Sequence, residues 1–233
     1  MPAHLEQVIA RIRAAESRFG RMPGSVQLLA VSKTQPAEAL RRAFHAGQRR
    51  FGESYVQEAL TKLEQLGDCP LEWHFIGPLQ SNKTKHIAAH FDWVHSIDRF
   101  KIAERLNDQR PPGLPPLNVC LQVNISGERT KSGVALAELA DLAAAVHALD
   151  RLRLRGLMAI PAPCADFEAQ RRPFRALREA LEALNAQLGL TLDTLSMGMS
   201  DDLEAAVAEG ATMVRIGTAI FGERPRPGAA PRG

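Results

Sequence analysis

Leu28-Leu29-Ala30-Val31-Ser32-Lys33-Thr34-Gln35-Pro36 is the stretch that decides the fold. Its four leading apolar residues predict a strand buried on both faces, and Pro36 ends that strand and suits the first turn of a helix. Lys33 therefore lies at the carboxyl end of an interior strand. It is either a side chain whose methylene stem covers the rim of the fold, or a reactive amine that forms a Schiff base with a carbonyl compound.

The same alternation of strand and helix continues along the chain. Strands are expected at 28–32, 49–53, 72–77, 93–97, 118–124, 153–160, 193–197 and 213–218. Helices are expected between them, after a first amphipathic helix at 3–19. Eight repeats of this length favour an α/β fold made of a single (β/α)₈ TIM barrel, with a doubly wound open sheet as the alternative. No GxGxxG motif follows the first strand, so a dinucleotide-binding sheet is disfavoured.

The composition is that of one soluble globular domain. Hydrophobic residues make up 45% of the 233 residues and charged residues 24%. We expect the barrel, with its N-terminal helix, to occupy residues 1–222, and residues 223–233 to form a disordered basic tail rich in Pro, Gly and Arg. That tail accounts for most of the net charge of +3. A nearly neutral body with 5% aromatic residues argues against nucleic-acid binding.

The sequence carries no sign of a membrane segment or of a metal centre. No apolar run is long enough to cross a bilayer and no signal-peptide core is present, so we expect a cytoplasmic protein without membrane contact. Three scattered cysteines indicate neither a disulfide framework nor a metal site. His86 and His90 are four residues apart on an expected helix, but no third ligand accompanies them.

Two motifs at strand ends carry most of the functional information. Ser196-Met197-Gly198-Met199-Ser200-Asp201-Asp202 leaves the seventh strand and opens a helix at 201–209. Ser200 or Asp201 is the expected cap of this helix, and Asp201 has capping-box spacing to Glu204. Arg215-Ile216-Gly217-Thr218 ends the eighth strand. In TIM barrels the loops after strands seven and eight frequently bind phosphate, although turn formation and capping alone would also explain these residues.

The interior arginine helps to indicate which ligand these two motifs bind. Arg215 lies two residues before Gly217 and points into the barrel, where a guanidinium needs an acceptor or a ligand that provides one. A lysine for a Schiff base, a phosphate site and an interior arginine together indicate pyridoxal 5′-phosphate (PLP). Lys33 would hold the aldehyde carbon, and Arg215 would donate to the pyridine nitrogen.

Six runs of sequence, in the same order, resemble those of the PLP homeostasis protein family, whose fold is similar to the barrel domain of alanine racemase. They are AVSKTQP (30–36), FGESYVQE (51–58), WHFIGPLQSNK (73–83), RGLMAIP (155–161), SMGMSDD (196–202) and VRIGTAIFG (214–222). The resemblance extends from about residue 5 to residue 222. It implies that PLP is bound by Lys33, Ser54, Met199, Ser200, Arg215, Gly217 and Thr218. Ser54 is a departure, because the family usually has asparagine there.

The resemblance leaves two functions to weigh. Arg215 keeps its proton, so the ring nitrogen stays unprotonated and is a poorer electron sink than a pyridinium. Alanine racemases take their second acid–base, a tyrosine, from a separate β-domain, and this sequence contains only Tyr55, at the start of a helix. We therefore expect a PLP carrier without catalytic residues that stores, buffers or delivers the cofactor. A weak PLP-dependent amino-acid racemase is the alternative.

Several further expectations follow from the carrier interpretation. The protein is expected to be a monomer that contacts apo-PLP-dependent enzymes transiently. Lys131 is a candidate second aldehyde-reactive amine, with a solvated loop lysine as the simpler interpretation. A barrel that binds other phosphorylated metabolites remains a third class if Lys33 is structural. His74 is interpreted as a hydrogen-bonded core residue, and Glu53 and Asp98 as a carboxylate pair only if the barrel brings them together.

Overall fold

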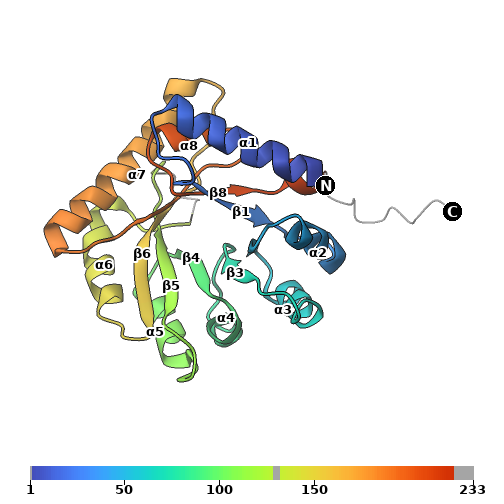
Figure 1. Ribbon diagram of the computed structural model, residues 1–233. Coiled ribbons are helices and arrows are strands. Elements are labelled where there is room, and N and C mark those ends of the chain that lie inside the picture. The colour runs from blue at the N-terminus through green and yellow to red at the C-terminus, as the bar shows by residue number, and fades with distance from the viewer. Residues whose placement is uncertain (1, 128–131, 223–233) are drawn as a thin grey trace.

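The computed structural model describes residues 2–127 and 132–222 and shows a closed barrel of parallel strands (Figure 1). The strands follow one another around the barrel in chain order, and the last pairs with the first. They are β1 (Gln27–Val31), β2 (Arg50–Glu53), β3 (Glu72–Phe75), β4 (Trp93–Ile97), β5 (Leu117–Gln122), β6 (Leu152–Met158), β7 (Thr194–Ser196) and β8 (Met213–Ile216). The TIM barrel prediction is confirmed and the open sheet is excluded. Lys131 and the predicted tail at 223–233 lie outside the described residues.

Helices surround the strands on the outside of the barrel (Figure 1). They are α1 (Pro2–Arg18), α2 (Ala37–His45), α3 (Val56–Gln65), α4 (Thr84–His90), α5 (Phe100–Gln109), a 3₁₀ turn (Leu136–Glu138), α6 (Leu139–His147), α7 (Phe167–Leu188), α8 (Leu203–Ala208) and α9 (Thr218–Phe221). The first helix, α1, precedes the barrel and packs against α8 and α9. Within 2–127 and 132–222, no helix combines the length and apolar character that crossing a membrane requires.

The strands are buried on both faces, as their continuous apolar runs predict. Every residue of β4 and of β8 is buried, because helices cover one face and interior side chains fill the other. In β1, the buried run is Leu28 to Ala30, and the chain leaves the barrel just after Val31. This places Lys33 at the carboxyl end of the barrel, where the functional groups of such folds gather.

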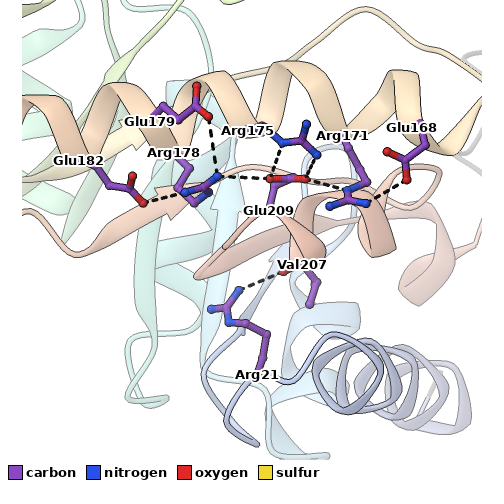
Figure 2. A network of polar contacts seen from close by, with 9 residues as sticks. All are labelled: Arg21, Glu168, Arg171, Arg175, Arg178, Glu179, Glu182, Val207 and Glu209. Atoms are coloured by element: carbon purple, nitrogen blue, oxygen red, sulfur yellow. Dashed lines mark hydrogen bonds and ion pairs between the residues drawn. The ribbon is translucent and has the colours of Figure 1, made fainter.

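Outside the barrel, a carboxylate joins α7 to the end of α8 (Figure 2). Glu209 is 3% exposed and accepts hydrogen bonds from Arg171 Nε at 2.7 Å and Arg175 Nη2 at 2.9 Å. Arg178 Nη2 completes the group with an ion pair at 3.7 Å. Three arginines on one face of α7 thus hold the neighbouring helix in place.

The structure corrects the predicted end of the last strand. β8 ends at Ile216, whereas the sequence pattern extended it to Thr218. Gly217 leaves the strand and passes so close to β1 that a Cβ atom would lie 3.0 Å from the Val31 carbonyl oxygen. Thr218 then begins the short helix α9, which the sequence analysis did not predict.

The predicted cap of α8 was also wrong. The helix begins at Leu203, and Asp202, rather than Ser200 or Asp201, occupies the N-cap position. The Asp202 side chain instead accepts a hydrogen bond from the Met199 backbone N–H at 2.6 Å and so closes the preceding loop. The capping-box partner Glu204 pairs with an arginine of α1, because a tertiary ion pair was available that local spacing does not reveal.

Candidate functional site

A pocket of about 590 Å³ opens at the carboxyl ends of the strands. It collects residues that lie at or just after the carboxyl ends of β1, β2, β7 and β8 and that are far apart in the sequence. All seven residues predicted from the sequence line it: Lys33, Ser54, Met199, Ser200, Arg215, Gly217 and Thr218. Apolar walls are provided by Val31, Ile76, Ile160 and Met199. The structure therefore brings together the whole predicted site.

The turn that carries Lys33 is held from both sides. Before it, the buried Ser32 donates from its hydroxyl to Glu53 Oε1 at 2.6 Å. After it, Thr34 has a φ of +66°, and its N–H donates to Glu58 Oε1 at 2.6 Å. A left-handed conformation in a β-branched residue costs on the order of 1–2 kcal/mol, so the surrounding contacts must impose it. Lys33 thus projects from a locally constrained turn.

A buried lysine from α3 lies beneath this turn. Lys62 Nζ donates to the Ser32 carbonyl at 2.8 Å, to Glu53 Oε1 at 2.8 Å and to Glu58 Oε1 at 2.5 Å. Burial raises the pKa of the Glu53 carboxyl, and Lys62 and Ser32 oppose this shift. Glu53 Oε2 is buried and has no hydrogen-bond partner among the described residues. Sequence reasoning missed Lys62, whose one local signal is its spacing of four residues from Glu58.

Glu53 and Asp98 do not form the carboxylate pair that the sequence left open. Glu53 is paired with Lys62, whereas Asp98 accepts a hydrogen bond from Arg99 at 2.6 Å. Neither carboxylate is among the residues that line the pocket.

Arg215 provides a fixed cation at the pocket wall. Its Nη1 donates to the Ser196 carbonyl at 2.5 Å and to Ser196 Oγ at 2.9 Å, and its Nη2 donates to the Ala159 carbonyl at 2.9 Å. Burial lowers the pKa of Arg215 to about 10, which leaves the guanidinium protonated in neutral solution. Two of its three nitrogens are thus held by neutral oxygens, and the side chain still lines the pocket.

Hydroxyl groups and glycine form another side of the pocket, at Ser200, Gly217 and Thr218. Arg11 of α1 supports this side, because its Nη1 donates to the Ser200 carbonyl at 2.7 Å while its other nitrogens bind Glu204. Sequence reasoning missed Arg11, since its partner Ser200 lies 189 residues away and no local pattern links them.

Two histidines lie in the barrel interior below the pocket. His74 contacts Glu72 Oε1 through Nε2 at 2.8 Å and His95 Nε2 through Nδ1 at 2.9 Å. His95 in turn contacts Ser196 Oγ through Nδ1 at 2.8 Å. The interpretation of His74 as a hydrogen-bonded core residue is confirmed, whereas His95 was not singled out from the sequence.

Within the part of the chain that the structure describes, no three His, Cys, Asp or Glu side chains are grouped to hold a metal ion. His90 donates from Nδ1 to the His86 backbone carbonyl at 2.9 Å.

The side chains of the pocket fit PLP. A lysine amine suits an aldehyde, a buried guanidinium suits a ring nitrogen, and hydroxyls beside glycine suit a phosphate, while the apolar walls suit a flat ring. The fold and the site define a TIM barrel with a lysine-bearing ligand pocket at the carboxyl ends of its strands.

Comparison with known proteins agrees with this class. Residues 3–225 match the family described as alanine racemase, N-terminal domain. The chain is 64% identical over 221 residues to the pyridoxal phosphate homeostasis protein of Pseudomonas aeruginosa, covering 95% of this chain and 94% of that protein. It is 59% identical over 224 residues to the protein of the same name from Escherichia coli K12, covering 95% of each. The chain belongs to the pyridoxal phosphate homeostasis protein family.

A solved relative shows the same architecture. The structure of PipY from Synechococcus elongatus with PLP bound superposes with a TM-score of 0.80 at 42% identity. The match covers 92% of this chain and 100% of that one.

Proposed function

We propose that this protein binds PLP in the pocket and acts in PLP homeostasis, as a store, buffer or donor of the cofactor. The observation that carries the proposal is the convergence of a lysine amine, a buried guanidinium and a hydroxyl-lined strand end on one pocket. The PLP-bound structure of PipY and the names of the two bacterial relatives support it.

Each pocket residue has a role in this proposal. The Lys33 amine forms a C=N bond to the aldehyde carbon, and the aldehyde oxygen leaves as water. Ser200, Gly217 and Thr218 bind the phosphate, and Arg215 donates to the ring nitrogen. Ser54 and Met199 contact the ligand at the pocket wall, with the Ser54 hydroxyl in place of the amide that is usual in the family.

The same residues disfavour turnover. PLP supplies, when bound, a conjugated ring that accepts electrons, and it does so best when its pyridine nitrogen is protonated. Arg215 is fixed by three hydrogen bonds and keeps its own proton in neutral solution, because its pKa remains at about 10. A guanidinium of this kind orients the ring without protonating it. Racemases of this fold act in spite of such an arginine, so the proposal of little or no catalysis rests also on the second acid–base, for which the sequence offers a single tyrosine, Tyr55 at the start of α3.

An absorbance titration with PLP tests the assignment of Lys33. The wild type is expected to develop the near-visible band of a Schiff base. Lys33→Ala is expected to lose it, and Lys85→Ala, at an exposed position on α4, to keep it. A wild type that PLP cannot titrate, or an unchanged band in Lys33→Ala, contradicts the assignment. Rapid racemisation of alanine by the loaded protein would make it an enzyme instead of a carrier.

A transfer assay tests delivery. The loaded protein, proposed to act as a cytoplasmic monomer, is mixed with an apo-PLP-dependent enzyme in the presence of a scavenger of free PLP. Activity that appears despite the scavenger indicates transfer during transient contact. Activity that appears only without it indicates buffering through free solution.

A further inference from the structure

A relay of hydrogen bonds crosses the barrel interior from the pocket to the opposite end. Arg215 Nη1 lies 2.9 Å from Ser196 Oγ, which lies 2.8 Å from His95 Nδ1. His95 Nε2 lies 2.9 Å from His74 Nδ1, and His74 Nε2 lies 2.8 Å from Glu72 Oε1. The relay thus links β8, β7, β4 and β3. Arg215 lines the pocket, whereas Glu72 begins β3 and has a side chain that is 36% exposed.

The two ends of the relay fix the direction of its terminal bonds. A guanidinium has no acceptor, so Arg215 donates to Ser196. A carboxylate has no donor, so Glu72 accepts from His74 Nε2–H, and this hydrogen bond is the main cause that lowers the pKa of Glu72. Burial lowers the pKa of His74, and that of His95 falls well below its ordinary value. The middle of the relay therefore consists of two neutral imidazoles.

With both imidazoles neutral, one arrangement of protons satisfies every bond. His74 donates from Nε2, so its Nδ1 accepts from His95 Nε2–H. His95 Nδ1 then accepts the Ser196 hydroxyl proton, and Ser196 Oγ accepts from Arg215. The reverse arrangement would aim the lone pair of His74 Nε2 at the Glu72 carboxylate. Both imidazoles are accordingly Nε2–H tautomers, and every donor points from the pocket toward Glu72.

This direction has an electrostatic consequence. Each group in the relay presents its negative end toward Arg215 and its positive end toward Glu72, so the dipoles stabilise the charges at both ends. Hydrogen bonds in a chain polarise one another in a low-dielectric interior. The guanidinium of Arg215 also donates to the neutral carbonyls of Ser196 and Ala159, and the relay connects this buried cation to a full negative charge.

The surroundings of the relay hold its rings in place. Trp93 stacks on His74, with ring centroids 5.4 Å apart and an angle of 9° between the planes. Charged and titratable neighbours lie at both ends: Arg50 and Asp92 near His74, and Asp202 and Cys120 near Arg215.

We propose that Glu72, His74, His95 and Ser196 are positioning residues that hold the Arg215 guanidinium in place and couple the far end of the barrel to the ligand ring nitrogen. The arrangement of protons is inferred from contacts within this chain and does not depend on PLP binding. The coupling to a ring nitrogen rests on the proposed function.

Nitrogen-15 NMR of the histidine rings in the PLP-free protein tests the arrangement of protons. Signals are assigned by their loss in His74→Gln and His95→Gln. Both rings are expected as Nε2–H tautomers that do not titrate near neutral pH. An Nδ1–H tautomer at either ring, or an ordinary imidazole titration of His95, overturns the relay.

Spectrophotometric PLP titration tests the coupling. Glu72→Leu, which removes the terminal acceptor without touching the pocket, is expected to weaken PLP binding about fivefold and to shift the absorbance of the bound ligand. Glu72→Gln keeps an acceptor and should lie between this variant and the wild type. Glu64→Gln, at an exposed position on α3, serves as the control and should match the wild type.

The outcomes separate the two proposals. Wild-type binding and an unchanged spectrum in Glu72→Leu overturn the coupling alone. A wild type that binds no PLP overturns the proposed function and the coupling with it, while the NMR result still decides the relay. The unfolding midpoint of each variant is compared with that of the wild type, so that weaker PLP binding is not confused with unfolding of the variant.

Discussion

Two buried carboxylates, Glu53 and Glu209, have opposite environments. Burial alone would raise the pKa of Glu209, but hydrogen bonds from Arg175 and Arg171 outweigh it, and the pKa lies below its ordinary value. Burial also raises the pKa of Glu53, where the single cation Lys62 does not reverse the shift. Glu209 joins two outer helices (Figure 2), whereas Glu53 lies beneath the turn that carries Lys33.

The difference separates a structural charge cluster from one that supports a site. The Glu209 cluster has several cations for one carboxylate and lies in the outer layer of helices. The Glu53 cluster has one cation, Lys62, that contacts two carboxylates, and one oxygen, Glu53 Oε2, without a hydrogen-bond partner in the described parts of the chain. A buried carboxylate oxygen without a hydrogen-bond partner lowers the stability of the fold, and such a loss is typical of residues beside a functional site.

The largest effect is expected from removing the single cation. Lys62→Met leaves the Glu53 carboxylate buried, with Ser32 as its one remaining hydrogen-bond donor among residues 2–127 and 132–222. Breaking a buried ion pair by removing one partner costs about 3–5 kcal/mol, so the free energy of unfolding should fall by that amount. Urea denaturation measures it, and Lys85→Met at an exposed position should change stability by no more than about 0.5 kcal/mol.

A double variant sharpens this prediction. Lys62→Met with Glu53→Gln removes the uncompensated charge as well, and should recover part of the lost stability. If the double variant is less stable than Lys62→Met alone, the account of Glu53 as an underpaired carboxylate is wrong.

A smaller effect is expected at the well-paired carboxylate. Glu209→Gln should lower the free energy of unfolding by about 1 kcal/mol, because it weakens charged hydrogen bonds to arginines that lie partly in water. PLP affinity should not change, since Glu209 does not line the pocket. Glu182→Gln, which loses only an exposed ion pair with Arg178, is the matched control. A loss of PLP affinity in Glu209→Gln would contradict the division between the two clusters.

The pH dependence of stability should differ in sign between the two carboxylates. Glu209 has a lowered pKa, so its contribution is present above the unfolded-state pKa and is lost as pH falls through the folded-state value. Glu53 has a raised pKa, so its contribution is present at low pH and is lost as pH rises through the folded-state value. Unfolding free energies should be measured across acidic pH. Glu209→Gln should reduce the loss of stability as the pH falls, and Glu53→Gln should reduce the loss of stability as the pH rises. If both variants changed the pH dependence of stability in the same direction, the comparison of Glu53 with Glu209 would be wrong.

The smallest effect is expected for Arg11→Ala. The ion pair with Glu204 is partly exposed, so stability should fall by no more than about 1 kcal/mol. The Ser200 loop loses its tie to α1, and PLP affinity should fall about twofold to threefold. Arg13→Ala on the same helix, which pairs with Glu16 away from the pocket, should leave PLP affinity unchanged.

Much of the fold could be predicted from local sequence signals. The long helix α7 is an example: Asp166 accepts a hydrogen bond from Ala169 N–H at its start, and Gly189 ends it with a φ of +64°. The strand ends were placed closely enough to collect Lys33 and Arg215 at one pocket. These features depend on periodicity, capping and turn chemistry within a few residues.

The supporting contacts could not be predicted in this way. His95 meets Ser196 across 101 residues of sequence, and Arg11 meets Glu204 across 193. Such pairs depend on the register of distant strands and on the seating of α1 against the barrel. The failed cap at Ser200 has this origin only in part: Arg11 binds the Ser200 carbonyl across 189 residues, whereas Asp202 binds the Met199 N–H locally, three residues away.

Borohydride reduction of the PLP-loaded protein, followed by peptide mapping with mass spectrometry, identifies the lysine that holds PLP. The reductant converts a Schiff base into a stable secondary amine and so marks the lysine that held the ligand. A stoichiometric pyridoxyl label is expected on the peptide that contains Lys33. A label on Lys62 or Lys131, or one spread over exposed lysines, would contradict it.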